Sequence, residues 1–427
     1  MSADAPSRMR WILVGWLAVI GAISYLDRVN LSIAAPSIAH EFHLSNVRLG
    51  LVFSAFNIGY GICQLPGGWV ADRLGPRKVL TFSALWWALF TSLTASIPTG
   101  IVFAALTFWS ARFLLGVGES VMYPSSNCWI ASWIPTGERG VANGVIFAGV
   151  GTGAAITPPI IALAMARFGW RASFHFCALM GVLGGLVWLW LSRDRPDAHP
   201  HVNEAEAQII ARGIEGGDVR RKPRLAWSAM LRNRSVWGVT ISYFCYGYVA
   251  FIFFTWFYIY LNTVRKVDVK SSSYYAMLPF VAMACCSAAG GVISDAVSRR
   301  FGPRWGRCGV AIVALLTAAI FVALGATAES ARSASIILAG GAGALYLSQS
   351  SYWSVSADLG GASAGSLSGL MNMGAQAGSA ITAALTPVIA DHIGWTSSFL
   401  VASGFCVLGA LAWLIVNPHQ TISSQTE

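Results

Sequence analysis

Four ionisable side chains lie inside apolar stretches of this sequence. Asp27 and Arg28 stand side by side near the middle of one apolar run, and Arg112 and Glu119 share another. A charged side chain at the centre of a membrane-spanning helix costs about 2.5–3.5 kcal/mol even on a lenient insertion scale. Such residues usually face a wet cavity or a partner of opposite charge, so these four predict a solute pathway through a membrane protein.

The chemistry of the four side chains suggests two roles. Arginine stays protonated at physiological pH and offers a planar fork that fits a carboxylate, so Arg28 and Arg112 are predicted to bind an anion. A low-dielectric site favours the protonated form of a carboxyl, so Asp27 and Glu119 are predicted to carry a coupling proton. We expect the neighbouring Arg28 to keep Asp27 ionised, which makes Glu119 the better candidate for the step that responds to substrate. A static structural network or an outer gate is the alternative for all four.

Spacing along the helix adds one constraint. Seven residues separate Arg112 from Glu119, so the two share a helix face but lie about 10 Å apart along the axis. Each therefore needs a partner elsewhere, such as Asp27, Arg28, water or a bound anion.

The composition is that of an all-α polytopic membrane protein. Hydrophobic residues make up 56% and charged residues 11% of the 427 residues, whereas about 25% of residues are charged in a typical soluble protein. A soluble enzyme and a nucleic-acid-binding protein are excluded. Runs of about 20 apolar residues predict transmembrane helices. Twelve such runs are found, at 11–38, 47–71, 79–97, 101–123, 138–165, 171–192, 235–262, 271–297, 306–326, 333–353, 361–388 and 396–416.

The distribution of basic residues predicts the topology. The first apolar run is too long for a cleaved signal peptide, so we expect it to remain as a transmembrane helix. Most of the 28 lysines and arginines then fall on the side of the membrane where the N-terminus lies. The positive-inside rule therefore places both termini in the cytoplasm. We expect the membrane to be the plasma (inner) membrane. The net charge of +10 is attributed to this topology.

Two segments of the first half recur in the second half at a nearly constant interval. GWVADRLGPRK around Asp72 corresponds to GVISDAVSRR around Asp295, and GWRASF around Trp170 corresponds to GWTSSF around Trp395. Internal repeats are typical of transporters. We predict three parts, an N-terminal six-helix bundle at 1–192, a cytoplasmic linker at 193–234 and a C-terminal six-helix bundle at 235–427.

The linker mixes acidic and basic residues. We interpret it as a solvated surface with a short amphipathic helix near 203–212, and assign it no chemistry. The eight cysteines are scattered through apolar stretches without metal-ligand spacing. They are predicted to be free thiols, and no metal site is expected.

Three features carry a resemblance to known transporters. The motif Gly68-x-x-x-Asp72-Arg73-x-Gly75-x-Arg77-Lys78 resembles the loop motif of the major facilitator superfamily. Within that superfamily, YLDRVNLS at 25–32, RFLLGVGE at 112–119 and GWR at 169–171 resemble the anion:cation symporter family. That family includes galactonate and hexuronate transporters and, more distantly, sialin and the vesicular glutamate transporters.

The resemblance implies a fold of two pseudo-symmetric six-helix halves that works by alternating access, with no catalytic residue and no cofactor other than the coupled proton. It implies a monomer in the lipid bilayer that carries a small-molecule carboxylate. In the family, the acids that match Asp27 and Glu119 are implicated in proton coupling, and the matching arginines in substrate binding or gating.

The loop motif and its repeat are predicted to act in gating. Their glycines permit close helix approach, and their charges can form and break pairs as the halves rock. The repeat has Ser294 and Ala296 where the first motif has Ala71 and Arg73, so we expect weaker pairing there. The predicted gating residues are Gly68, Asp72, Arg73, Arg77 and Asp295.

Neutral polar and aromatic residues on several spans could complete a substrate cavity. An amide or a phenol suits the hydroxyls of a polyol acid, although helix–helix hydrogen bonding is an equally good explanation for any single one. The predicted substrate-binding residues of this kind are Tyr25, Tyr60, Tyr243, Gln349, Trp353 and Asn372. The resemblance singles out Tyr25, Tyr60, Trp353 and Asn372.

These observations predict a proton-coupled symporter that imports an organic anion. Sugar acids (aldonate, hexuronate or aldarate) are the leading substrate class. Aromatic or small dicarboxylates, such as phthalate or tartrate, are the alternative substrates. A proton-driven drug exporter shares the loop motif but does not need two intramembrane arginines, and a channel or receptor is a further alternative.

Overall fold

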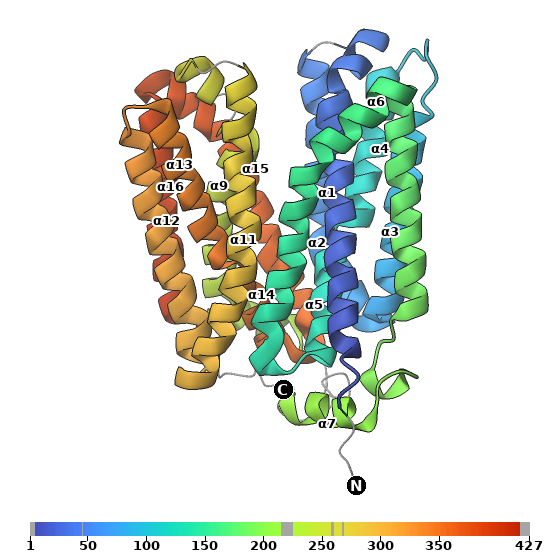
Figure 1. The fold of residues 1–427 in the computed structure, drawn as a ribbon, viewed down its shortest axis with the longest axis vertical. Coiled ribbons are helices and arrows are strands. Elements are labelled where there is room, and N and C mark those ends of the chain that lie inside the picture. The colour runs from blue at the N-terminus through green and yellow to red at the C-terminus, as the bar shows by residue number, and fades with distance from the viewer. Residues whose placement is uncertain (1–4, 45, 215–224, 258–259, 267–268, 419–427) are drawn as a thin grey trace.

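The computed structural model describes residues 5–44, 46–214, 225–257, 260–266 and 269–418, and these are helical with no strand among them (Figure 1). The helices of both halves overlap the apolar runs predicted from the sequence. In the first half the helices are α1 (Met9–Glu41), α2 (Asn46–Leu74), α3 (Pro76–Ala95), α4 (Ala104–Glu119), α5 (Met122–Trp133) and α6 (Arg139–Leu191). In the second half they are α9 (Arg234–Thr255), α11 (Val269–Phe301), α12 (Val310–Thr327), α13 (Ala331–Leu347), α14 (Gln349–Gly360), α15 (Ala364–Ile393) and α16 (Trp395–Ala412).

Two glycines mark the corresponding turn in each half. Gly169 has φ 80° and bends the long α6 into two rods, and Gly394 has φ 99° and separates α15 from α16. No atom lies within 4 Å of a Cβ built at either position, so the backbone conformation and not crowding favours glycine there. Gly169 and Gly394 open the repeated segments GWRASF and GWTSSF. The repeat therefore makes the same turn in both halves.

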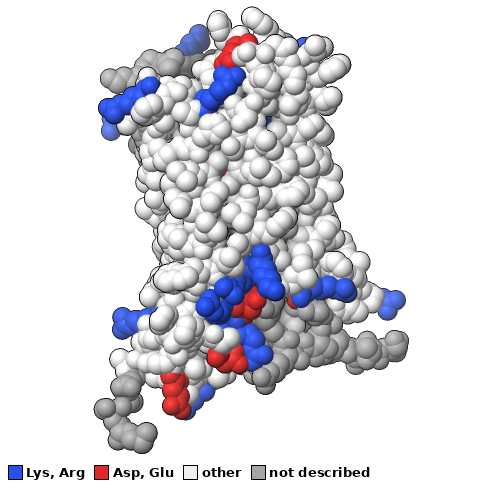
Figure 2. Space-filling view, turned by 90° about the vertical axis from the view of Figure 1, so that its right-hand side faces the viewer, with Lys and Arg blue, Asp and Glu red and all other residues white. Residues whose placement is uncertain are grey.

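The described helices supply the twelve predicted spans. Seven helical segments are long and apolar enough to cross a membrane on their own. Others are shorter, such as α4 with 16 residues and α13 with 17, and each continues into the helix that follows it. The bent α6 counts as two spans, and α4–α5 and α13–α14 as one each. Charged side chains gather at the two ends of the molecule on the face drawn in Figure 2.

The helices form two groups that lie side by side (Figure 1). One contains α1 to α6 and the other α9 to α16, and they meet where α2 packs on α15 and α6 packs on α11. Both ends of the chain lie at the bottom of Figure 1, together with α7 (Glu204–Gly213). We call this end the termini face and the opposite end the far face. The residue boundaries of the two bundles and the linker stay a prediction.

The linker helix is attached more firmly than a solvated surface would be. The predicted helix is present as α7, and its N-terminus is capped by Asn203, whose side chain accepts from the Glu206 amide at 3.0 Å. Glu206 is fully buried and accepts the amides of Met9 at 2.8 Å and Arg10 at 3.2 Å, together with the Arg10 guanidinium at 3.1 Å. The linker thus caps the first turn of α1, which the solvated interpretation did not include.

Candidate functional site

Arg28 on α1 and Glu119 on α4 form an ion pair within the membrane-spanning region. Nε and Nη2 of Arg28 lie 2.8 and 2.7 Å from Oε1 of Glu119. The Arg28 side chain is 20% exposed, whereas that of Glu119 is 1% exposed. Oε2 of Glu119 is buried and accepts no hydrogen bond from the described residues. Arg28 therefore neutralises one oxygen of Glu119, while part of the Arg28 side chain stays accessible.

Asp27 turns away from Arg28, into the N-terminal bundle. Its neighbours are Thr91 on α3, Cys177 on the second rod of α6, and Arg112 on α4. Both carboxylate oxygens are buried, and neither accepts a hydrogen bond from the described part of the chain. Nε and Nη1 of Arg112 are equally without a partner there.

The two acids and two bases are thus arranged crosswise between α1 and α4, with one direct ion pair among them. Arg28 meets Glu119, and Asp27 faces Arg112. The expectation that Arg28 would stabilise the charge of Asp27 is wrong, because consecutive residues of a helix project about 100° apart. The expectation that Glu119 needs a partner elsewhere is confirmed by Arg28, whereas Arg112 lies near Asp27 without an ion pair to it.

Aromatic rings surround the Arg28 guanidinium. Its Cζ lies 4.9 Å from the ring centre of Tyr25, 4.9 Å from that of Phe56 and 4.6 Å from that of Tyr60. Such cation–π contacts fix the guanidinium without neutralising its charge. The Tyr25 ring is also 6.4 Å from Phe254 on α9, so this aromatic cluster touches the second group of helices.

A second polar cluster lies on α9 and α14. The hydroxyl of Tyr243 accepts hydrogen bonds from Nε2 of Gln349 at 2.9 Å and from Nε1 of Trp353 at 3.0 Å. The Tyr243 hydroxyl proton remains available to donate. The Trp353 ring is 5.8 Å from Tyr123, so the cluster meets the N-terminal half there.

The structure brings most of the predicted binding residues into these two clusters. Tyr25 and Tyr60 surround Arg28, while Tyr243, Gln349 and Trp353 hold one another. Asn372 is buried on α15, and no described contact joins it to either cluster, so its role stays a prediction.

Sequence reasoning missed several members of the site. Phe56 and Tyr123 were not predicted, although each stands four residues from a predicted one, Tyr60 and Glu119. Residues four apart share a helix face, so that spacing is the signal that could have found them. Cys177 and Thr91 gave no such signal because they approach Asp27 from other helices.

Asp72 joins the two halves at the termini face. Its carboxylate accepts hydrogen bonds from the amide of Gly365 at 2.9 Å and from the amide and hydroxyl of Ser366 at 2.8 and 2.5 Å. It therefore caps the first turn of α15. A Cβ at Gly68 would lie 2.1 Å from the carbonyl oxygen of Gly365, so glycine is needed for this close approach.

Asp295 repeats this arrangement in the other direction. It accepts the amides of Gly140 at 3.0 Å and Val141 at 2.6 Å in the first turn of α6, and it pairs with Arg307 at 2.5 Å. Asp295 and Arg307 are both almost fully buried. The expectation of weaker pairing in the repeat is therefore wrong, because Arg307 supplies the charge that the local sequence lacks.

The two remaining gating candidates stay within the first half and the linker. Arg73 lies over the ring of Trp69 at 4.0 Å, and Arg77 donates to the carbonyl of Leu189 while its amide donates to Asp194. A cross-half ion pair that the sequence did not indicate joins Arg139 to Asp358 at 2.5 Å. The gating assignments remain predictions.

Comparison with known proteins places this geometry in a family. Residues 17–373 match the Major Facilitator Superfamily. The chain is 33% identical over 424 residues to a probable sulfoacetate transporter of Cupriavidus necator, covering 98% of this chain and 96% of the relative. It is 30% identical over 402 residues to a hexuronate transporter of Bacillus subtilis, covering 93% and 92% of the two chains. The solved structure of a proton:xylose symporter superposes with a TM-score of 0.76 at 17% identity, covering 95% of this chain and 96% of that one, which shows a shared fold.

The family match and the transporters among its relatives show that the chain is a transporter, not an enzyme. The chain belongs to the major facilitator superfamily, and its relatives place it among the organic-anion carriers of the anion:cation symporter type. The expected fold and family are confirmed, and so is the general expectation of an organic-anion transporter in a membrane.

Proposed function

We propose that this protein is a proton-coupled symporter that imports a sugar acid (an aldonate, hexuronate or aldarate) by alternating access. The termini face lies in the cytoplasm, and the membrane is the plasma (inner) membrane. The observation that carries the proposal is the ion pair of the partly exposed Arg28 with the buried Glu119. The family and its organic-anion relatives support the substrate class.

The pair supplies a coupling mechanism through competition for one cation. A substrate carboxylate that reaches Arg28 forms hydrogen bonds with its guanidinium and displaces Glu119. Glu119, left in a buried site without its counter-charge, is then stable only in its protonated form. Substrate and proton therefore bind together, and the ion pair forms again only after both have left.

The cluster around Tyr243 supports a hydroxylated substrate. Tyr243 has a free hydroxyl proton, and Oε1 of Gln349 is buried without a hydrogen bond in the described chain. Together they offer a donor and an acceptor of the kind that binds a sugar hydroxyl. In this proposal Arg28 binds the acid group of the substrate, and the Tyr243 cluster binds its hydroxyl groups.

A short sulfonate is the second candidate substrate. It is favoured by the 33% identity over 98% of this chain to a relative named as a probable sulfoacetate transporter. A sulfonate presents oxygens to the Arg28 fork much as a carboxylate does, but it does not need the Tyr243 cluster.

Uptake into proteoliposomes tests the proposal. Purified protein would be assayed with labelled glucuronate, glucarate, sulfoacetate, phthalate and tartrate, with and without an inward proton gradient. Gradient-driven accumulation of a sugar acid is expected. Accumulation of sulfoacetate alone would select the second candidate, and equal uptake with and without the gradient would refute proton coupling.

A further inference from the structure

A series of polar groups begins beside Asp27 and leads away from the region between the two halves. Nδ2 of Asn30 donates to Sγ of Cys177, a neighbour of Asp27, at 3.5 Å. Oδ1 of Asn30 accepts from the hydroxyl of Ser173 at 2.9 Å, and the same hydroxyl lies 2.7 Å from the carbonyl oxygen of Trp170. Asn30, Ser173 and Cys177 are all buried, in an interior that is otherwise apolar.

The polar groups form two facing stripes. Cys177, Ser173 and Trp170 follow one another by about one turn along the second rod of α6. On α1, Asp27 and Asn30 are likewise one turn apart, and Ser37 lies two turns beyond Asn30 on the same face. Both stripes run from Asp27 toward the far face.

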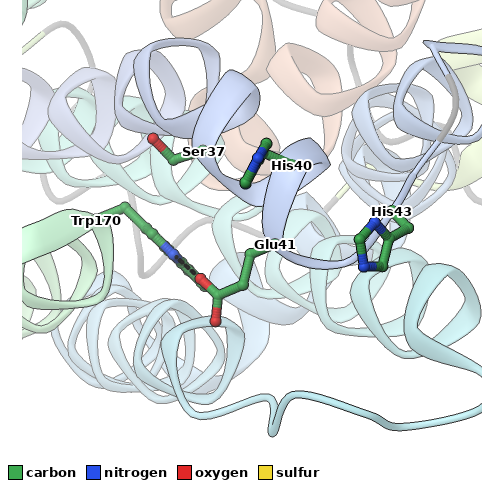
Figure 3. A pocket seen from close by; sticks show the side chains of 5 residues that line it. All are labelled: Ser37, His40, Glu41, His43 and Trp170. Carbon is green, nitrogen blue, oxygen red and sulfur yellow. Dashed lines mark hydrogen bonds between the residues drawn. The ribbon is translucent and has the colours of Figure 1, made fainter.

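The stripes end at a pocket on the far face. Ser37, His40, Glu41, His43 and Trp170 line a cavity of about 650 Å³ (Figure 3). The indole of Trp170 donates to Oε2 of Glu41 at 2.6 Å, and Arg171 pairs with Oε1 of Glu41 at 2.6 Å. His40 and His43 are exposed there. The pocket is therefore lined by polar side chains at a surface that bulk water reaches.

The pathway has one short apolar interruption. Between Asn30 and Ser37 the buried α1 position on the same face is Ala34, whose small side chain is 0% exposed. The distance from Asn30 to Ser37 along the helix axis is about 10 Å, which a few water molecules can bridge if polar groups at both ends hold them.

We propose that Asp27 receives its proton from the far-face pocket by a route inside the N-terminal bundle, along Ser37, Ser173, Asn30 and Cys177, separate from the substrate path between the halves. A proton moves from bulk water to the Asp27 carboxylate, which becomes a neutral carboxyl. The charged groups that face Asp27 are Arg112 and Glu119 on α4, and the polar ones are Thr91 on α3 and Cys177 on α6. The inference rests on the proposed proton coupling.

This route would separate the two acids by their access to protons. Glu119 lies against Arg28, whose exposed edge faces the aromatic cluster that touches α9. Asp27 is 2% exposed and has no such opening. Proton loading of Asp27 could then proceed while substrate occupies the region between the halves.

The first test compares Ser173→Ala with Thr94→Val. Both remove one buried hydroxyl of the N-terminal bundle that donates to a backbone carbonyl, but of the two only Ser173 lies on the route. Ser173→Ala should slow proton-driven uptake about tenfold, the effect of one hydrogen bond lost from a rate-limiting relay. It should leave counterflow, which needs only substrate exchange, at the wild-type rate. Ser173→Thr, which keeps the hydroxyl, should restore uptake, and Ser173→Ala should have no added effect in an Asp27→Asn background.

The outcomes separate the route from the symport proposal. Wild-type uptake that ignores the proton gradient would refute symport and the route with it. Gradient-driven uptake at equal rates in wild type, Ser173→Ala and Thr94→Val would refute the route alone.

The second test uses the wild-type protein and so does not depend on any variant folding. Cys177, Cys245 and Cys406 are each 0% exposed, and only Cys177 lies on the route. Methyl methanethiosulfonate should modify Cys177 faster than the other two, as measured by peptide mass spectrometry over time. Modification of Cys177 no faster than that of Cys245 and Cys406 would overturn the proposal.

Discussion

Arg28 is bound to Glu119 at 2.7 Å across two helices and not to Asp27, its neighbour in the chain. This pairing assigns different surroundings to the two buried acids. In the proposed mechanism Glu119 shares Arg28 with the substrate anion, whereas Asp27 faces Arg112 inside the bundle. The predictions below depend on this difference.

Replacing Glu119 with glutamine should uncouple transport from the proton. Glutamine has the shape of the protonated carboxyl but cannot release a proton, and it leaves Arg28 free for the substrate. Glu119→Gln should therefore bind and exchange substrate in counterflow but fail to accumulate it under a proton gradient. Accumulation at the wild-type level would refute the assignment, and loss of both binding and counterflow would indicate a structural role.

Lysine substitutions should distinguish the two arginines. Lysine keeps the charge but loses the planar fork. Arg28→Lys should weaken substrate binding about 10–100-fold, as expected for a lost charged hydrogen bond. Arg112 is 3% exposed, so Arg112→Lys should alter the proton dependence of uptake more than the affinity. Isothermal titration of both variants tests this, and wild-type affinity for Arg28→Lys would rule out a direct clamp.

The sequence predicted which residues carry charge into the membrane but not how they pair. The cost of burying a charge is a local property, so Asp27, Arg28, Arg112 and Glu119 could be recognised from apolar surroundings alone. Their partners depend on the rotation of α1 against α4, which helix packing determines. The repeat likewise predicted equivalent positions for Asp72 and Asp295 but not their contacts.

The errors share one physical cause. The weak pairing expected at Asp295 overlooked Arg307, which belongs to the segment that follows α11. The solvated interpretation of the linker overlooked Glu206, whose partners lie at the start of the chain. In both cases the stabilising partner lies outside the local motif, 12 residues from Asp295 and 197 residues from Glu206, so the charges of the motif itself contain no information about it.

Weakening the cap at the termini face should slow turnover more than it weakens binding. Asp72→Asn keeps one acceptor oxygen but replaces the one that accepts from Ser366 with an NH2 group. The loss of such a hydrogen bond costs about 1 kcal/mol, which shifts a two-state equilibrium about fivefold. Asp72→Asn should lower the maximal uptake rate several-fold with little change in affinity. Arg73→Gln is the control because Arg73 contacts Trp69 in its own half. A wild-type rate for Asp72→Asn would remove this loop from the mechanism.

Asp295→Asn should have a larger effect than Asp72→Asn. It removes the nearer charged partner of the buried Arg307 and leaves only Asp358, at 4.0 Å. Breaking a buried ion pair typically costs about 3–5 kcal/mol. We expect lower thermal stability in detergent as well as slower uptake. A smaller loss of stability than in Asp72→Asn would contradict the pairing described for the repeat.

The attachment of the linker to α1 should depend on pH through Glu206. Burial alone would raise the pKa of this carboxyl, but hydrogen bonds from Ser7, from the backbone of Met9 and Arg10 and from the Arg10 side chain lower the pKa below its ordinary value. A lowered pKa means that the ionised form stabilises the fold above the ordinary carboxyl value of about 4.3. This contribution is lost as the pH falls through the folded pKa. At neutral pH, Glu206→Gln should therefore lower the free energy of unfolding by about 1–3 kcal/mol, and the deficit should shrink below about pH 4. Thermal unfolding of wild type, Glu206→Gln and the control Glu204→Gln, whose side chain is exposed, measures it in detergent between neutral and acidic pH. A deficit that stays constant over this range, or one equal to that of Glu204→Gln, would show that the buried charge of Glu206 does not hold the linker to α1.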